Sequence, residues 1–100
     1  YCAMAYPGSP LYDEAIHEGW TLPAAWAGYS QHNRYCRPLD TKHLAARDVL
    51  AFRDAAFVEY FSDPAYRDHL AARFGSGALA EVNRMLAYRL DRDLLSGAIE

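Results

Sequence analysis

Apolar and polar positions at the start of the chain follow first a strand pattern and then a helix pattern. Residues 1–6 are apolar on both faces of a two-residue repeat, as in a strand that is covered on both sides of a parallel sheet. Pro7-Gly8 interrupts this pattern. Ser9 can then cap a helix that begins with Pro10 and stops at Gly19. Strand, tight turn and helix together make half of a βαβ unit.

Residues 20–43 show no periodic pattern of apolar positions. They carry bulky aromatic side chains among prolines and a glycine, and these aromatics are Trp20, Trp26, Tyr29 and Tyr35. Unstructured connections of this length are uncommon in compact domains and tend to be functional or to wrap over another surface. We therefore expect an ordered, aromatic-rich loop.

Residues 44–100 have the spacing of about three amphipathic helices. Asp40 or Thr41 can cap the first, which is predicted to run from about residue 43 to 61 with an apolar row of Ala46, Leu50, Phe57 and Phe61. Pro64 begins the second helix. The third carries Leu79, Val82, Leu86 and Leu90 and is predicted to continue to Leu94. These helices can share one core, and the predicted fold class is mainly α, with one terminal β-strand and helix before the three amphipathic helices.

The chain offers no second convincing strand with which residues 1–6 can pair. A strand without partners is not stable, and the sequence does not begin with Met. We therefore expect these 100 residues to belong to a larger protein that contains a sheet. If these 100 residues were isolated from that protein, residues 1–6 would expose apolar edges.

Composition narrows the classes of function. A net charge of −3 without a basic block argues against nucleic-acid or membrane-surface binding. The sequence contains no run of about 18 apolar residues, so it predicts no membrane span. The two cysteines, Cys2 and Cys36, are interpreted as free thiols in a reducing, cytoplasmic environment. No spacing of Ser, His and Asp indicates a catalytic residue, and the four histidines show no metal-site spacing.

Three sequence segments together resemble a known family. They are Tyr1-Cys-Ala-Met-Ala-Tyr-Pro-Gly-Ser-Pro-Leu-Tyr12, Trp26-Ala-Gly-Tyr-Ser-Gln31 and Phe52-Arg-Asp-Ala-Ala-Phe57, followed by Tyr60-Phe61, Pro64 and Phe74-Gly75. Their order and spacing are similar to the C-terminal part of radical S-adenosylmethionine proteins with a cobalamin-binding domain. This broad group includes anaerobic magnesium-protoporphyrin ester cyclases and B12-dependent radical methyltransferases. The resemblance covers essentially the whole chain.

The resemblance implies an organisation in three segments. Residues 1–19 would be the last strand and helix of a partial (β/α) barrel, 20–43 the ordered loop, and 44–100 a C-terminal helical extension. In this family the cofactors lie at the carboxyl ends of the barrel strands, as in parallel α/β sheets generally. The resemblance therefore places Met4, Ala5, Tyr6 and Pro7 near S-adenosylmethionine, mainly through backbone groups.

The resemblance also implies cofactors that these residues do not themselves hold. The family binds a [4Fe–4S] cluster on a Cys-x3-Cys-x2-Cys loop and cobalamin on an N-terminal domain, and this sequence contains no such cysteine loop. The basic segment Asn33-Arg-Tyr-Cys-Arg37 departs from the family pattern. The partners implied are the rest of the parent chain and a small-molecule substrate, and the parent would be an enzyme that generates a 5′-deoxyadenosyl radical.

Four further residues are candidates for a substrate pocket. Trp26 and Tyr29, with Tyr35, either line a pocket for a flat ligand or form part of a core. His32 lies in the long loop and is the histidine most suited to meet a substrate. Arg53 falls within the apolar arc of its helix, so we expect either a structural ion pair with Asp13 or Glu14 or an anion-binding role. The Pro7-Gly8-Ser9 turn is a weaker candidate for holding an anion.

Two functions are consistent with the sequence. The first is the C-terminal segment of a radical S-adenosylmethionine enzyme, which completes the barrel wall, is inactive alone, and serves cobalamin-dependent methyl transfer or oxidative cyclisation. The alternative is a helical interaction or structural module without a cofactor, whose strand pairs with the sheet edge of another protein.

Overall fold

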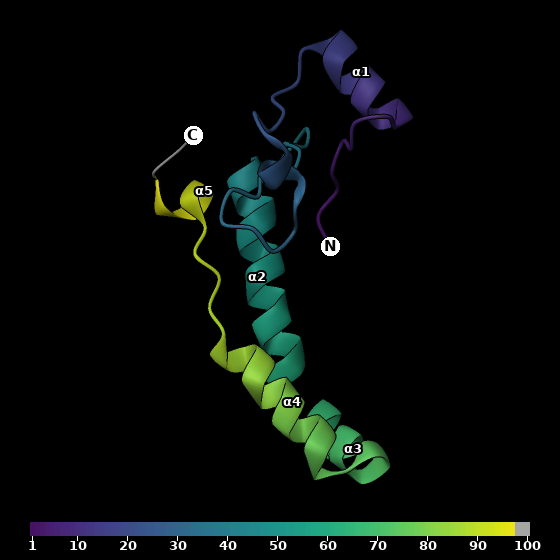
Figure 1. Ribbon diagram of the computed structural model, residues 1–100, viewed down its shortest axis with the longest axis vertical. Coiled ribbons are helices and arrows are strands. Elements are labelled where there is room, and N and C mark those ends of the chain that lie inside the picture. Colours follow the sequence, from purple (N-terminus) through teal and green to yellow (C-terminus); the bar gives the residue numbers. More distant parts are fainter. Residues whose placement is uncertain (98–100) are drawn as a thin grey trace. The chain divides into compact units, whose positions relative to one another are not determined.

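The computed structural model describes residues 1–97 and shows a mainly helical chain. These residues form five α-helices and one short 3₁₀ helix, without a β-strand (Figure 1). The elements are α1 (Pro10–Glu18), η1 (Trp26–Tyr29), α2 (Ala46–Ser62), α3 (Pro64–Phe74), α4 (Ser76–Ala87) and α5 (Asp93–Ser96). The predicted mainly α class is confirmed.

The chain divides into two compact units. The first unit contains Tyr1–Arg53 and the C-terminal segment from Leu90, and the second contains Asp54–Arg89. The boundary therefore falls within α2, whose first half belongs to the first unit. The segment after α4 belongs to the same unit as the N-terminus, whereas the sequence pattern groups it with the helical extension.

The core of the first unit is assembled from segments far apart in the sequence. The extended N-terminus contributes Cys2 and Met4, the loop contributes Cys36, α2 contributes Ala46 and Leu50, and α5 contributes Leu94. Val49 and Leu95 pack against this cluster. The buried residues in the first half of α2 therefore pack against irregular segments, whereas the sequence pattern places them in a core with the later helices.

The predicted strand over residues 1–6 is not formed. A strand needs the backbone of a neighbouring strand, and none is present in residues 1–97. Instead, the Cys2 N–H donates to Oε1 of Gln31 at 3.0 Å, and Nε2 of Gln31 donates to the Cys2 carbonyl at 2.9 Å. The Leu39 N–H donates to the Ala3 carbonyl at 3.3 Å. The Gln31 amide thus takes the place that a peptide group of a second strand would occupy.

The α1 helix has the predicted ends. Ser9 Oγ accepts from the Tyr12 N–H at 3.1 Å, and Pro10 occupies the first turn. Gly19 ends the helix with φ 72°, a left-handed conformation that costs glycine little. Ala15 is buried, whereas the neighbouring Ile16 is 58% exposed.

The α2 helix begins at Ala46, three residues later than predicted, because a separate turn precedes it. Thr41 Oγ1 accepts from the N–H groups of His43 and Leu44 and so closes this turn. Asp40 Oδ1 accepts from the Ala46 N–H at 2.7 Å. Both predicted capping residues are therefore used, Asp40 at the helix itself and Thr41 in the turn before it.

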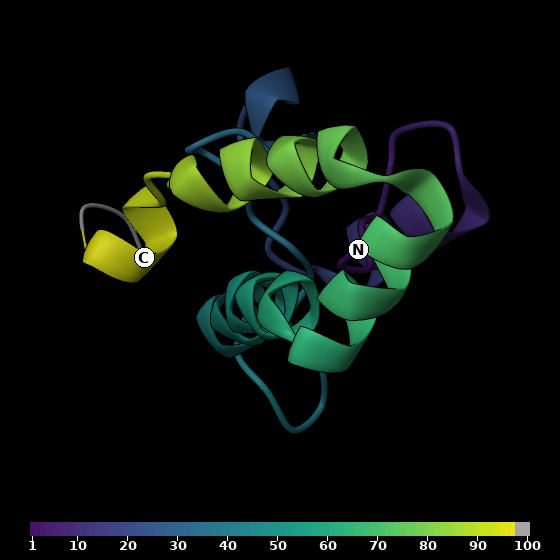
Figure 2. The ribbon, with the colours of Figure 1, turned by 90° about the horizontal axis from the view of Figure 1, so that it is seen from below.

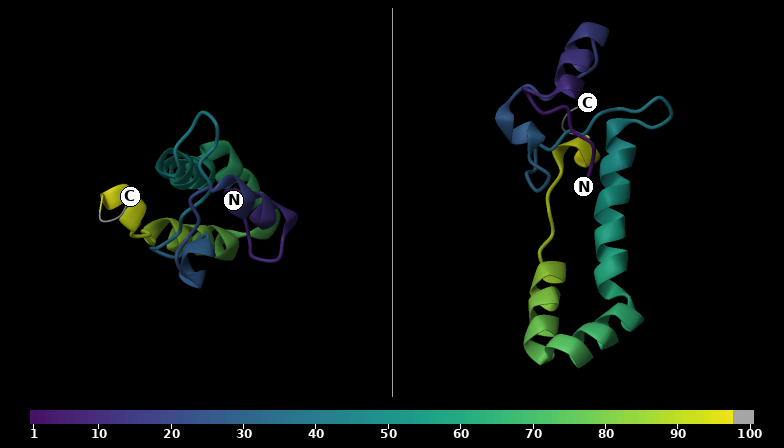
Figure 3. Two further views of the ribbon diagram at one scale, coloured as in Figure 1. Left: turned by 90° about the horizontal axis from the view of Figure 1, so that it is seen from above. Right: turned by 90° about the vertical axis from the view of Figure 1, so that its right-hand side faces the viewer.

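The second unit consists of the end of α2 followed by α3 and α4. Asp63 caps α3 by accepting from the Tyr66 N–H at 3.0 Å, and Pro64 is its first residue as predicted. α3 and α4 pack against each other and meet at a sharp bend at Gly75 (Figures 2 and 3). Arg67 of α3 donates to the Phe61 carbonyl and to Asn83 of α4.

The predicted continuation of the last helix to Leu94 is wrong, since α4 ends at Ala87 and Tyr88 is extended. Hydrogen bonds within the first unit explain the different course of the later residues. The Arg92 guanidinium donates to the Asn33 carbonyl at 2.9 Å, and the Asp93 N–H donates to the Arg34 carbonyl at 3.0 Å. Leu94 then enters the core of the first unit from the short helix α5.

Candidate functional site

The four residues expected near S-adenosylmethionine differ in how far they are exposed to solvent. Met4 and Ala5 are buried, at 7% and 2% exposed, so their side chains belong to the interior. Tyr6 is 47% exposed, and its carbonyl accepts from the N–H and Oγ of Ser9 at 3.0 and 2.6 Å. Pro7 is half-buried in the turn.

The peptide groups of Met4 and Ala5 are unused. Within residues 1–97, neither the N–H nor the C=O of either residue has a hydrogen-bond partner. Peptide groups in buried segments are nearly always paired, so these four groups are available to a ligand or to another backbone.

Tyr6 lies beside Tyr29, and Tyr29 in turn lies beside Trp26, the second residue of this group that is expected in the substrate pocket. The ring centroids of Tyr6 and Tyr29 are 6.1 Å apart, and those of Trp26 and Tyr29 are 6.3 Å apart. We call Tyr6, Trp26 and Tyr29 the aromatic cluster. Trp26 is 78% exposed, so the cluster presents a ring to solvent. Burial, and then the proximity of Tyr12, raise the pKa of the Tyr29 phenol.

A glycine positions two members of the aromatic cluster. Gly28 lies between Ala27 and Tyr29 in η1, is buried, and packs directly on Pro23. A Cβ atom at Gly28 would lie 2.4 Å from the Pro23 Cβ, which is closer than atoms can approach. The Gly28 carbonyl accepts from the Arg37 N–H at 2.9 Å and ties η1 to the following loop.

The other two pocket candidates contact each other. Arg53 Nη2 lies 3.1 Å from His32 Nε2, and the His32 ring meets the edge of Tyr1 with centroids 6.1 Å apart. A guanidinium can only donate, so Nε2 of His32 accepts and its proton resides on Nδ1. The contact of Arg53 is thus with His32 of the loop, while Asp13 and Glu14, the partners expected from the sequence, are exposed.

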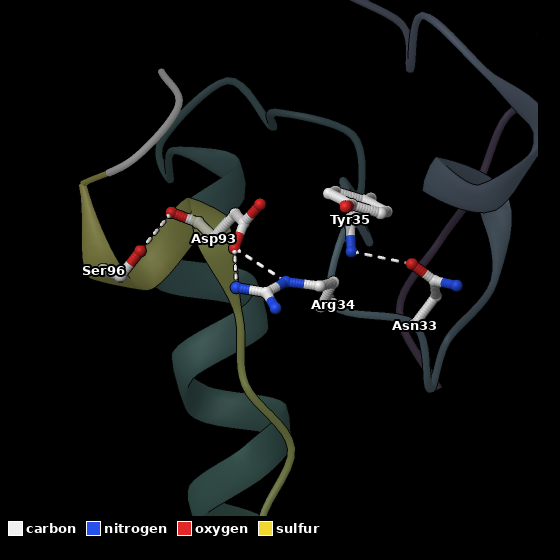
Figure 4. Close-up of polar contacts among 5 residues, drawn as sticks. All are labelled: Asn33, Arg34, Tyr35, Asp93 and Ser96. Atoms are coloured by element: carbon white, nitrogen blue, oxygen red, sulfur yellow. Dashed lines mark hydrogen bonds and ion pairs between the residues drawn. The ribbon is translucent and has the colours of Figure 1, made fainter.

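A clamp between the loop and α5 was not expected from the sequence (Figure 4). Arg34 Nε and Nη2 lie 3.1 and 2.8 Å from Oδ1 of Asp93. The hydrogen bond and charge of Asp93 raise the pKa of Arg34. Asn33 Oδ1 accepts from the Tyr35 N–H at 2.9 Å, and Ser96 Oγ donates to the Asp93 carbonyl at 2.9 Å. No local pattern indicates the pair of Arg34 and Asp93, since these residues are 59 positions apart.

The pair of Arg34 and Asp93 gives Arg34, which belongs to the basic segment of residues 33–37, a structural role. Tyr35, grouped with Trp26 and Tyr29 in the sequence, has the Arg34 guanidinium 5.9 Å from its ring centroid. Cys36 is completely buried and, like Cys2, belongs to the core of the first unit. Both cysteines therefore serve packing in the first unit.

The described part of the chain supplies no metal centre and no membrane span. In residues 1–97 no three His, Cys, Asp or Glu side chains gather as ligands for a metal ion. None of the helices in this range has the length and apolar character needed to cross a bilayer.

Comparison with known proteins gives no relative from which a role can be transferred. No protein-family model matches the chain, and no curated protein or solved structure matches it significantly.

Proposed function

We propose that this chain is the C-terminal segment of a radical S-adenosylmethionine enzyme that carries out cobalamin-dependent methyl transfer or oxidative cyclisation. The single observation that supports this proposal best is the set of unused peptide groups at Met4 and Ala5. In a barrel, these groups would pair with a neighbouring strand or face the ligand at the strand's carboxyl end. Residues 1–6 would then form the last barrel strand once the rest of the parent chain is present.

The residues fit one of the implied cofactors and not the others. The free N–H and C=O groups of Met4 and Ala5 suit the donor and acceptor edge of an adenine, and the exposed ring of Tyr6 can pack beside it. The residues described here hold no cluster ligands, so the [4Fe–4S] cluster and cobalamin would be bound elsewhere in the parent. When bound, the cluster and S-adenosylmethionine supply the radical chemistry.

The remaining candidates would hold the substrate. The exposed face of Trp26 and its neighbour Tyr29 offer an apolar surface for a flat group. His32 would offer its Nδ1–H as a donor, and Arg53 would fix the His32 ring and add a positive charge. These roles are binding and orientation, and none of them is a step of the chemistry itself.

A test uses the complete protein encoded by the reading frame that contains these residues. Purified without oxygen, it should be brown and should convert S-adenosylmethionine to 5′-deoxyadenosine in the presence of a strong reductant. Ala5→Pro removes the free N–H and should raise the KM for S-adenosylmethionine roughly 10-fold, the loss of about one hydrogen bond. Ala5→Gly keeps the N–H and serves as the matched control.

The same unused peptide groups also support the alternative of a module that adds its N-terminal segment to the sheet edge of another protein. A reading frame without an upstream Cys-x3-Cys-x2-Cys motif, giving a colourless protein that does not cleave S-adenosylmethionine, would contradict the enzyme and favour this module.

A further inference from the structure

A cavity with charged walls lies beside the first turn of α2, within the first unit. Its volume is about 400 Å³, within the range of small-molecule sites. Its walls come from the chain after α1, the loop before α2, the first turn of α2, and α5, and include Thr21, Arg37, Asp40, Ala46, Arg47 and Leu94. Two guanidinium groups against one carboxylate give the cavity a net positive charge.

Arg37 has hydrogen-bonding capacity that the described residues do not use. Its side chain is only 15% exposed, and its Nη2 lies 3.7 Å from Oδ2 of Asp40, too far for a hydrogen bond. Its Nε and Nη1 are buried, with no hydrogen-bond partner among residues 1–97. A guanidinium in this state is unfavourable unless it gains an acceptor.

Asp40 is held in place by a hydrogen bond of its own. Its Oδ1 accepts from the Ala46 N–H at 2.7 Å and so holds the start of α2. The α2 helix is 17 residues long, and the positive end of its dipole lies at the same place. Arg47, exposed on the first turn, adds a second cation. The unused guanidinium groups of Arg37, the charge of Arg47 and the helix dipole favour an anion in the cavity, and Asp40 opposes them with one negative charge.

We propose that this cavity binds a small oxyanion, a carboxylate or a phosphate, with Arg37 as its principal ligand and Arg47 as a second positive group. A guanidinium presents its N–H groups as a planar fork that matches two oxygens of either anion. Thr21 lies in the same wall, and a threonine hydroxyl can donate to a third oxygen. The site shares no residue with the proposed substrate and cofactor contacts, so it stands or falls independently of them.

The direct test is NMR of the full chain labelled with ¹⁵N, observing the arginine Nε–Hε signals. Sodium phosphate and sodium succinate are titrated separately at constant ionic strength, and sodium chloride is the control. We expect a saturable shift of the Arg37 signal with at least one oxyanion and none with chloride. A shift with phosphate alone identifies a phosphate site, and a shift with succinate alone identifies a carboxylate site. If neither anion gives a saturable shift of the Arg37 signal, the proposal is overturned.

Variants separate this cavity from other positive surfaces. Arg37→Gln, followed by the Arg47 Nε–Hε signal, should weaken anion binding roughly 10- to 100-fold, the effect of losing charged hydrogen bonds. Arg47→Ala, at an exposed position that leaves the core intact, should weaken it roughly 2- to 5-fold. Arg73→Ala, on an exposed position of α3, should leave it unchanged. If anion binding is unchanged in both Arg37→Gln and Arg47→Ala, the assignment of these arginines as ligands of the anion is refuted. If Arg37→Gln does not fold, the result for Arg47→Ala alone decides.

Discussion

The two units of this chain build their structure from contacts of different range. The first unit joins an extended N-terminus, an irregular loop, the start of α2 and α5, and its defining hydrogen bonds connect Cys2 to Gln31 and Arg34 to Asp93. The second unit uses neighbours in sequence: Phe57, Tyr60, Phe61 and Tyr66 form one group of ring contacts. Each unit is therefore stabilised by a different kind of interaction.

The two units also differ in their share of buried apolar residues. Among the buried apolar residues of the described chain, Val82 alone belongs to the second unit, and the others belong to the first. Irregular backbone in the first unit is kept in place by burial and by side chain to backbone hydrogen bonds. In the second unit, the helices satisfy their own backbone and need less burial to form. Substitutions in the first unit should therefore be more damaging than matched ones in the second.

The largest effect is expected from Leu50→Ala. Leu50 is fully buried where the N-terminus, the loop and α5 meet, so the substitution leaves a cavity that irregular segments cannot all refill. We expect a loss of about 2–5 kcal/mol in the free energy of unfolding, measured by urea denaturation. Leu44→Ala in the same unit, at a residue that is 53% exposed, should change it by less than about 0.5 kcal/mol. Equal losses in the two variants would contradict the position of the core.

Glycine to alanine substitutions should act in opposite directions in the two units. Gly28→Ala places a methyl group 2.4 Å from the Pro23 Cβ, so η1 or Pro23 must move at a cost of about 1–3 kcal/mol. Gly77→Ala lies in α4 with no atom within 4 Å of the added Cβ, and should stabilise the helix by about 0.4–1 kcal/mol. Thermal unfolding of both variants measures the difference, and a destabilised Gly77→Ala protein would argue against helix at that position.

Variants of Gln31 test whether its amide replaces a strand. Gln31→Glu can still accept from the Cys2 N–H but cannot donate to the Cys2 carbonyl, so we expect a loss of about 1 kcal/mol. Gln31→Leu loses both hydrogen bonds, and amide exchange at Cys2 should become faster only in this variant. Slow exchange at Cys2 in Gln31→Leu would show that another group protects this peptide.

The sequence predicts the parts of the fold that depend on neighbours along the chain. Ser9, Pro10 and Gly19 define α1, and Asp63 and Pro64 define the start of α3, because capping acts within a few residues. The end of α4 and the position of Leu94 are missed, since the apolar spacing continues while hydrogen bonds to Asn33 and Arg34 redirect the backbone. Among the candidate site residues, the sequence selects His32 and Arg53 separately, but nothing in it indicates that they contact each other.

The smallest predicted effect concerns the pH dependence of the first unit. Burial and Tyr12 raise the pKa of the Tyr29 phenol, so the folded state holds this proton more tightly than the unfolded state does. The resulting stability is fully present below the ordinary tyrosine pKa of about 10 and is lost as the pH rises through the folded pKa. Urea denaturation at pH 8 and pH 10.5 should show a smaller alkaline loss in Tyr29→Phe than in the unaltered protein. Tyr88→Phe, which removes a phenol that is 72% exposed in the second unit, is the control. If both variants keep the full alkaline loss, Tyr29 is not responsible for it, and the aromatic cluster is more open to water than its ring contacts indicate.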